Sequence, residues 1–261
     1  MSDLKFALEV RQGREAAEVF AEALSAQIQR LGGTVITDDE TAPDIVVGVG
    51  GDGTMLGAVR RSLIWDVPVI GFNLGTIGFL AEAEPPDLEP AVQRLIAGDY
   101  DIDERTTVAA TIGEVTALGV NDVVVEKIDS TRLVSLDVVI DGEPFVTYRA
   151  DGLIVATPTG STAYSFSAGG PLVDHGVHAL VMTPVSTHSL FDRPLVLPDT
   201  TSIEVTVSSD RPVKVNVDKT ALGQLDEHES VTISKGDRPA RFVSLSGRTF
   251  SGLVKDKFGL K

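Results

Sequence analysis

A short apolar segment that runs directly into a cluster of glycines constrains the fold of this chain most strongly. Residues 45–49 read Ile-Val-Val-Gly-Val, and residues 50–53 read Gly-Gly-Asp-Gly. The run of β-branched residues predicts a buried strand. Residues 54–61 carry apolar side chains at helical spacing, so a helix is expected to begin directly after the glycines.

A strand, a glycine turn and a helix start together predict a place for phosphate. Glycines let backbone N–H groups approach an anion closely, and a helix N-terminus favours negative charge. Asp52 is unusual in such a turn, because a carboxylate repels phosphates. Its expected uses are to hold a cation or to accept a proton from a hydroxyl nucleophile. The simpler alternative is a glycine turn in which Asp52 caps the helix.

Composition limits the possible classes of protein. The chain has 261 residues, 43% of them hydrophobic, which suffices for one large or two ordinary domains. There is no apolar run of about 18 residues, and the start shows no signal-peptide pattern, so a cytoplasmic protein that spans no membrane is expected. Cysteine is absent, which excludes disulfides, thiolate metal sites and cysteine nucleophiles.

The chain is strongly acidic, with 38 Asp and Glu residues against 22 Lys and Arg residues and a formal net charge of −16. A field of that sign disfavours binding to nucleic acid or to an anionic membrane surface. The acidity suits a salt-rich cytoplasm, where repulsion is screened, and equally an ordinary acidic protein.

Two domains are expected. Strands and helices alternate over residues 1–100, which predicts an α/β domain with a parallel, Rossmann-like sheet. Over residues 101–248 short β-type runs with turn signals predominate and predict an all-β, sandwich-like domain. We expect residues 249–261 to return to the first domain. The β-type runs assigned to the second domain include 107–112, 115–120, 123–127, 133–140, 144–149, 153–156, 202–208, 213–217, 230–234 and 240–244.

Three further stretches carry side chains suited to binding. Residues 73–80, Asn-Leu-Gly-Thr-Ile-Gly-Phe-Leu, follow a predicted parallel strand, and ligands of open α/β sheets bind at such ends. Asn121 and Asp122 offer donors and acceptors for a base or ribose. Residues 151–171 run from a strand into small hydroxyl residues, among which Tyr164 supplies a stacking face.

Together these stretches resemble the NAD kinase family. The resemblance covers nearly the whole chain in the family's order, and the segment Thr-Pro-Thr-Gly-Ser-Thr-Ala-Tyr at 157–164 is its most specific part. It implies transfer of a phosphoryl group from ATP, or from polyphosphate, to the 2′-hydroxyl of the adenosine ribose of NAD. The matching motifs are residues 50–54, 73–80, 121–122, 151–165, 167–171, 188–190 and 193–194.

The resemblance also implies roles for individual residues. Asp52 matches the family's catalytic Asp, taken as the base on the 2′-hydroxyl. The residues expected to contact NAD are Gly53, Asn121, Asp122, Arg132, Arg149, Asp151, Thr162, Ala163, Tyr164, Ser165 and Ser167. The residues expected around the phosphates of ATP are Gly50, Gly51, Gly53, Thr54, Asn73 and Gly75.

Cofactor and assembly follow from the same resemblance. Mg²⁺ or another divalent cation is expected, held mainly through substrate phosphates rather than by a protein ligand cluster. A homodimer or homotetramer is expected, because NAD kinases assemble through the β-rich domain. The chain departs from the family at Gly57, where Arg or Lys is frequent, and at Thr220, where Gln is frequent.

Two other functions share part of this pattern. A lipid kinase of the diacylglycerol type also carries Gly-Gly-Asp-Gly-Thr, but it needs a membrane-docking surface, and this chain is acidic. A non-catalytic dinucleotide sensor on the same scaffold gains nothing from a carboxylate that faces phosphate, so Asp52 argues against it.

Overall fold

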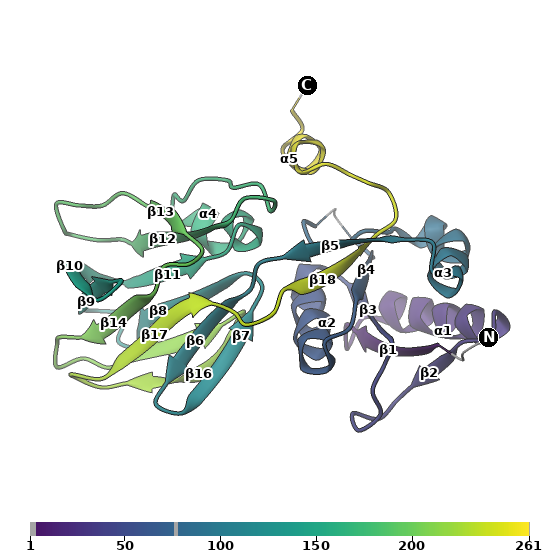
Figure 1. Cartoon of the computed structure of the whole chain (residues 1–261), viewed down its shortest axis with the longest axis horizontal. Coiled ribbons are helices and arrows are strands. Elements are labelled where there is room, and N and C mark those ends of the chain that lie inside the picture. Colours follow the sequence, from purple (N-terminus) through teal and green to yellow (C-terminus); the bar gives the residue numbers. More distant parts are fainter. Residues whose placement is uncertain (1–3, 76–77, 261) are drawn as a thin grey trace. The chain divides into compact units, whose positions relative to one another are not determined.

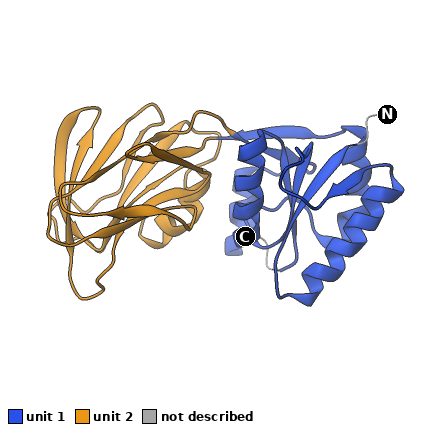
Figure 2. Ribbon diagram, turned by 90° about the horizontal axis from the view of Figure 1, so that it is seen from below, with its two compact units in different colours: residues 1–105, 240–261 blue, residues 106–239 orange. Residues whose placement is uncertain are grey.

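The computed structural model describes residues 4–75 and 78–260, which form two compact units. Unit 1 comprises residues 1–105 and 240–261, and unit 2 comprises residues 106–239 (Figure 2). The fold class of an α/β unit followed by an all-β unit is confirmed. The boundaries differ from 100/101 and 248/249, because residues 101–105 and 240–244 are strands of the first sheet.

Unit 1 is built on one six-stranded sheet with the order β2-β1-β3-β4-β18-β5 (Figure 1). The first five of these strands run parallel, whereas β5 pairs antiparallel with β18, so the sheet is mixed rather than wholly parallel. The strands are β1 (Lys5–Val10), β2 (Thr34–Ile36), β3 (Ile45–Gly50), β4 (Val69–Asn73), β5 (Asp101–Arg105) and β18 (Ala240–Ser244). The helices are α1 (Glu15–Arg30), α2 (Asp52–Trp65), the 3₁₀ turn η1 (Pro85–Asp87), α3 (Leu88–Ala97) and α5 (Phe250–Phe258).

Alternation along β3 decides which helix covers which face of this sheet. Ile45, Val47 and Val49 point into a core shared with α1 and α3. Gly48 lies on the other face, where Met55 of α2 packs so closely that a Cβ on Gly48 would lie 2.5 Å from its sulfur. The glycine therefore lets α2 lie directly on the strand that leads into it.

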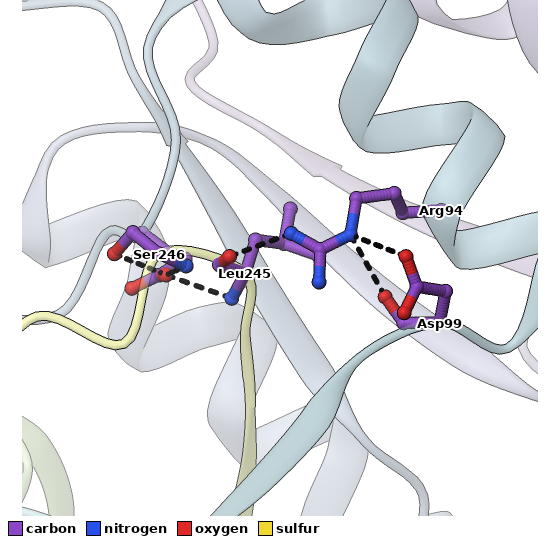
Figure 3. A network of polar contacts seen from close by, with 5 residues as sticks. Arg94, Asp99, Leu245 and Ser246 are labelled. Atoms are coloured by element: carbon purple, nitrogen blue, oxygen red, sulfur yellow. Dashed lines mark hydrogen bonds and ion pairs between the residues drawn. The ribbon is translucent and has the colours of Figure 1, made fainter.

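The C-terminal segment is fastened to unit 1 by polar contacts (Figure 3). Arg94 of α3 donates to the backbone oxygen of Leu245 at 2.6 Å and to Asp99 at 2.9 Å. The backbone N–H groups of Leu245 and Ser246 donate to Glu82 at 2.8 and 2.6 Å. These contacts hold the segment just after β18 at the first unit.

Unit 2 is a sandwich of two antiparallel six-stranded sheets, with the orders β10-β9-β14-β17-β6-β7 and β13-β12-β11-β8-β15-β16. Side chains from both sheets form one apolar core that includes Leu136, Leu153 and Val205. The strands are β6 (Val108–Ile112), β7 (Val115–Gly119), β8 (Asp122–Lys127), β9 (Val134–Ile140), β10 (Glu143–Ala150), β11 (Gly152–Ala156), β12 (Ala179–Val185), β13 (Leu195–Pro198), β14 (Ile203–Val207), β15 (Val213–Val217), β16 (Thr220–Leu225) and β17 (Ser230–Lys235). Two short helical turns, η2 (Thr159–Thr162) and α4 (Tyr164–Ser167), follow β11.

Candidate functional site

The glycine turn lies between β3 and α2, as the sequence predicts. A Cβ on Gly50 would lie 2.5 Å from the hydroxyl of Thr54, so no larger residue fits there. A Cβ on Gly51 or Gly53 would meet nothing within 4 Å. Their freedom from neighbours leaves the backbone at the start of α2 open to a ligand, which suits phosphate.

Asp52 is the first residue of α2, and its carboxylate is directed to the loop that follows β4. It accepts hydrogen bonds from the backbone N–H groups of Phe79 at 3.3 Å and Leu80 at 3.4 Å. A Cβ on Gly78 would lie 1.9 Å from its Oδ1 atom. The N-cap of α2 is Gly51, without a side-chain cap, so the alternative in which Asp52 caps the helix is wrong.

The loop after β4 is tied to itself and to the loop after β1. Asn73 is buried; its side chain donates to the oxygen of Gly75 at 3.3 Å and accepts from the N–H of Gly75 at 3.2 Å. Arg14 donates to the oxygen of Leu74 at 2.8 Å. This cation was not among the predicted residues, because an Arg just before a helix carries no signal of its own. Thr76 and Ile77 of the predicted motif lie outside the described residues.

Helix α5 also contacts the loop beside Asp52. The ring of Phe258 lies 6.5 Å from that of Phe79, measured between centroids, and the ammonium of Lys257 lies 5.7 Å from the Phe79 ring. Phe79 is the residue whose N–H donates to Asp52. The C-terminal helix therefore packs on a residue that holds the proposed base in place.

In unit 2, Asn121 and Asp122 form the entry to β8, and a single carboxylate binds their backbone. Asp218 accepts from the N–H groups of Val120 at 2.6 Å, Asn121 at 2.8 Å and Asp122 at 3.1 Å. The N–H of Asp218 in turn donates to the oxygen of Asp122 at 3.1 Å. Asp218 thus holds the predicted binding residues Asn121 and Asp122 in place. The sequence does not reveal this role, because Asp218 and Asn121 lie 97 positions apart.

The opposite side of the same dipeptide rests on the loop after β11. The N–H of Thr157 donates to the oxygen of Asn121 at 2.8 Å, and its hydroxyl donates to the oxygen of Val120 at 2.5 Å. A Cβ on Gly160 would lie 1.9 Å from the Asn121 oxygen. The two predicted motifs, residues 121–122 and 157–164, are therefore in direct contact.

Burial changes the acidity of the carboxylates at this place. Desolvation, together with the nearby charge of Asp218, raises the pKa of Asp122 to about 7, although Lys219 acts in the opposite direction. Desolvation also raises the pKa of Asp218, against its three backbone hydrogen bonds. The Asp218 carboxylate is taken up by its three backbone hydrogen bonds, so Asp122 is the carboxylate here that a cation or hydroxyl group of a ligand would meet.

The segment after β11 presents some of its predicted residues and buries others. Tyr164 is 41% exposed, and burial together with the charges of Glu126 and Asp151 raises the pKa of its phenol. Ser165 is fully buried and shares a 2.9 Å hydrogen bond with Thr183. Residues Thr162 and Ala163 are half-buried, and Ser167 is exposed. Ser165 therefore holds the segment in place, while Tyr164 remains available for stacking.

The remaining predicted residues lie toward the other end of β8. Asp151 forms an ion pair with Lys127, and Arg149 is exposed near the start of β11. Five strand residues, or about 17 Å, separate this end from Asp122. The structure places Arg132 farther on, in a groove of 330 Å³ that it shares with Asp129 and Arg211. It is not brought together with Asn121.

A protein-built metal centre is not found among residues 4–75 and 78–260, which contain no group of three or more His, Asp or Glu side chains arranged to hold an ion. Within the same ranges, no helix is both long and apolar enough to cross a membrane.

Comparison with known proteins identifies the family over most of the chain. Residues 8–100 match the model of the ATP-NAD kinase N-terminal domain, and residues 120–245 match that of the ATP-NAD kinase C-terminal domain. A NAD kinase of Heliobacterium modesticaldum is 43% identical over 82% of this chain and 78% of its own length. This chain belongs to the NAD kinase family. A NAD kinase of Thermococcus sibiricus is 41% identical over 82% of this chain and 79% of its own length.

Solved structures of NAD kinases agree with the fold. The crystal structure of yeast NADH kinase complexed with NADH superposes with a TM-score of 0.86 at 26% identity, over 99% of this chain and 88% of that one. Because the family match includes the C-terminal domain, it favours a NAD kinase over a lipid kinase that shares only the glycine turn. The chain is a phosphotransferase by family.

Proposed function

We propose that this NAD kinase transfers the terminal phosphoryl group of ATP to the 2′-hydroxyl of the adenosine ribose of NAD, which gives NADP. The observation that carries the proposal is the half-buried carboxylate of Asp52, held by two backbone N–H groups beside an open glycine turn. A hydroxyl nucleophile needs a base, and phosphoryl transfer otherwise needs mainly positioning and charge neutralisation. The same reaction consumes two soluble metabolites, so we also propose a cytoplasmic location.

In this proposal unit 1 serves the phosphates. The backbone of Gly50, Gly51, Gly53 and Thr54 receives them at the start of α2. Asn73 and Gly75 shape the neighbouring loop through their mutual hydrogen bonds. The carboxylate of Asp52 accepts the proton of the 2′-hydroxyl as the bond to phosphorus forms.

Unit 2 serves NAD. The side chains of Asn121 and Asp122 bind hydroxyl groups of a ribose, and Tyr164 stacks on adenine. The remaining proposed contacts come from the hydroxyl, amide and charged groups near both ends of β11, namely Thr162, Ala163, Ser167, Arg149 and Asp151. The hydroxyl of Ser165 supports the segment rather than the ligand, because it is bonded to Thr183.

We propose Mg²⁺ as the cation of the reaction. Mg²⁺ keeps much of its water and binds through substrate phosphates with one or two carboxylates, so a site without a protein ligand cluster fits it. The ion would supply charge neutralisation on the phosphates, and Asp52 is the carboxylate in unit 1 that lies beside their proposed place.

The variant Asp52→Asn tests the function. It keeps the shape and loses the basicity, so kcat for NADP formation is expected to fall at least 10²-fold, about the contribution of one general base, while KM for NAD changes little. Asp39→Asn is the matched control, because the Asp39 side chain is 92% exposed. Full activity of Asp52→Asn would remove the base assignment, and an inactive wild-type chain would remove the function.

We further propose a homodimer or homotetramer formed through unit 2. Phe145 and Phe191 pack edge to face at 5.8 Å and remain 44% and 36% exposed, next to fully exposed Leu190. Monomeric proteins rarely keep such apolar groups together in water. Light scattering at micromolar concentration should show an oligomer that Leu190→Asp dissociates, and a wild-type monomer would refute the assembly.

A further inference from the structure

An apolar groove of unit 1 borders the loop that follows β4, and apart from Asn73 and Gly75 none of its lining residues has been given a role. Its volume is 600 Å³, within the range of small-molecule sites. Helix α1 supplies one wall, and the end of β4 and the start of η1 supply the other. The lining residues are Ala16, Val19, Phe20, Ala23, Asn73, Leu74, Gly75, Glu84 and Pro85.

The groove lies where a nucleotide is expected in a sheet of this kind. Asn73 ends β4, one of the parallel strands, and ligands of open α/β sheets bind outside the carboxyl ends of such strands. The N–H of Leu74 donates to the oxygen of Gly50 at 3.3 Å, so the wall of the groove is bonded to the glycine turn. A ligand that occupies the groove therefore lies next to the proposed phosphate site.

The apolar side chains of the lining also suit an aromatic, uncharged ligand group. Phe20 is fixed by contact with the ring of Phe72, with 5.3 Å between the centroids. Val19 is 58% exposed and adds apolar surface to the wall of the groove. Glu84 lines the groove, and its carboxylate accepts the N–H of Asp87 in the capping box of η1. The carboxylate has further lone pairs that can accept a hydrogen bond from an exocyclic amine, and its charge repels phosphate.

An arginine side chain contacts the loop that lines this groove. Arg14 donates to the oxygen of Leu74, a lining residue, at 2.8 Å. A Cβ on Gly50 would lie 3.2 Å from the Cβ of Arg11, three residues earlier in the same loop. In a chain with a net charge of −16, two Arg residues at this edge are the groups suited to a polyphosphate. The first turn of α1 carries Glu15 and Glu18, so Arg14 and not the helix end would attract the anion.

We infer that this groove binds the adenosine part of the phosphoryl donor, with its triphosphate passing Arg14 toward the glycine turn. The inference rests on the proposed use of ATP and adds the place where its base is bound. Adenine suits the groove because its amino group can donate to Glu84, whereas guanine presents an oxygen at the same ring position and meets repulsion.

Calorimetric titration of the full chain tests the inference, with MgATP and with magnesium tripolyphosphate, which lacks adenosine. Ala23→Trp fills the groove and should raise the Kd of ATP at least tenfold while leaving that of tripolyphosphate unchanged. Arg14→Gln should raise both. Ala26→Trp is the matched control, since Ala26 is exposed on the same helix and does not line the groove.

Base selection gives a second measurement. Glu84→Gln keeps an acceptor but adds a donor, so the preference for ATP over GTP, as the ratio of their Kd values, should fall several-fold. Unchanged ATP binding in a folded Ala23→Trp variant would overturn the inference. Equal weakening of ATP and tripolyphosphate by that variant would also overturn it. Either result leaves the proposed function standing as long as the wild-type chain still converts NAD to NADP.

Discussion

The Oδ1 atom of Asp218 lies 2.8 Å from the backbone nitrogen of Asn121 and accepts its hydrogen bond. Asp218 begins the turn between β15 and β16, at a left-handed φ of 47°, whereas Asn121 enters β8. The Asp218 carboxylate accepts hydrogen bonds from three successive N–H groups. The conformation of residues 120–122 therefore depends on one side chain from the hairpin of β15 and β16. Asp218 is therefore a positioning residue for the proposed NAD contacts.

Asp218→Asn should weaken NAD binding. One oxygen of the amide can still accept from Asn121, but its NH₂ group would face the N–H of Val120, which now donates to Oδ2 at 2.6 Å. A buried donor left unpaired costs about 1–3 kcal/mol. We expect KM for NAD to rise at least tenfold and kcat to fall less, measured by steady-state kinetics. Asp226→Asn, exposed at the other end of β16, is the control; equal effects of both variants would contradict the assignment.

Stability should depend on pH through Asp122. Its pKa is raised from 3.8 to about 7 in the folded chain, so the folded state holds the proton more firmly than the unfolded state between these values. The free energy of unfolding therefore decreases as the pH rises from about 4 to about 7, as far as this group is concerned. Asp122→Asn mimics the protonated form, so its stability relative to wild type should increase from pH 5 to pH 8. Urea unfolding of both proteins measures this difference, and a constant difference across that range would refute it.

Gly78→Ala should disturb Asp52. A Cβ at this position would lie 1.9 Å from Oδ1 of Asp52, so the carboxylate or the loop must move. We expect kcat to fall at least tenfold without loss of NAD binding. Gly51→Ala provides a contrast: nothing lies within 4 Å of its Cβ, so the melting temperature should stay unchanged while KM for ATP rises. A fully active Gly78→Ala enzyme would show that the position of Asp52 does not matter.

Salt should stabilise the protein. The net charge of −16 produces repulsion in the folded state, and the Debye length falls from about 10 Å at 0.1 M to about 3 Å at 1 M salt. The melting temperature should therefore rise between dilute buffer and molar KCl. Scanning calorimetry at several KCl concentrations measures it, and a flat or falling curve would refute the prediction.

Local signals predicted much of this fold. The strand, the glycine turn and the helix over residues 45–65 follow from β-branched residues, clustered glycines and apolar spacing, which all act within a few residues. The dipeptide Asp141-Gly142 is likewise a local signal for a tight hairpin turn, and both residues adopt the positive φ that such a hairpin needs. The turn between β15 and β16, at Asp218 and Lys219, contains no glycine. Because this local turn signal is missing, β16 was not predicted.

Long-range relationships were the part that local patterns could not supply. Residues 240–244 were predicted as a strand of the second domain, but β18 pairs with β4 and β5 of the first sheet. Partner choice depends on packing between distant segments, and a strand pattern is the same in either sheet. The support of Asn121 by Asp218 and the contact of Arg14 with Leu74 are of this kind, since each joins residues far apart in the sequence.

The place of β18 between β4 and β5 has a consequence for synthesis on the ribosome. Residues 106–239 emerge before β18, so the sandwich can form while the first sheet still lacks an inner strand. Until then β4 and β5 each keep an unpaired edge, which exposes them to misassociation in the nascent chain. Completion of the sheet of unit 1 thus has to wait until all of residues 106–239 have been translated. A chain released before β18 would lack an inner strand of the first sheet, however well its sandwich had folded.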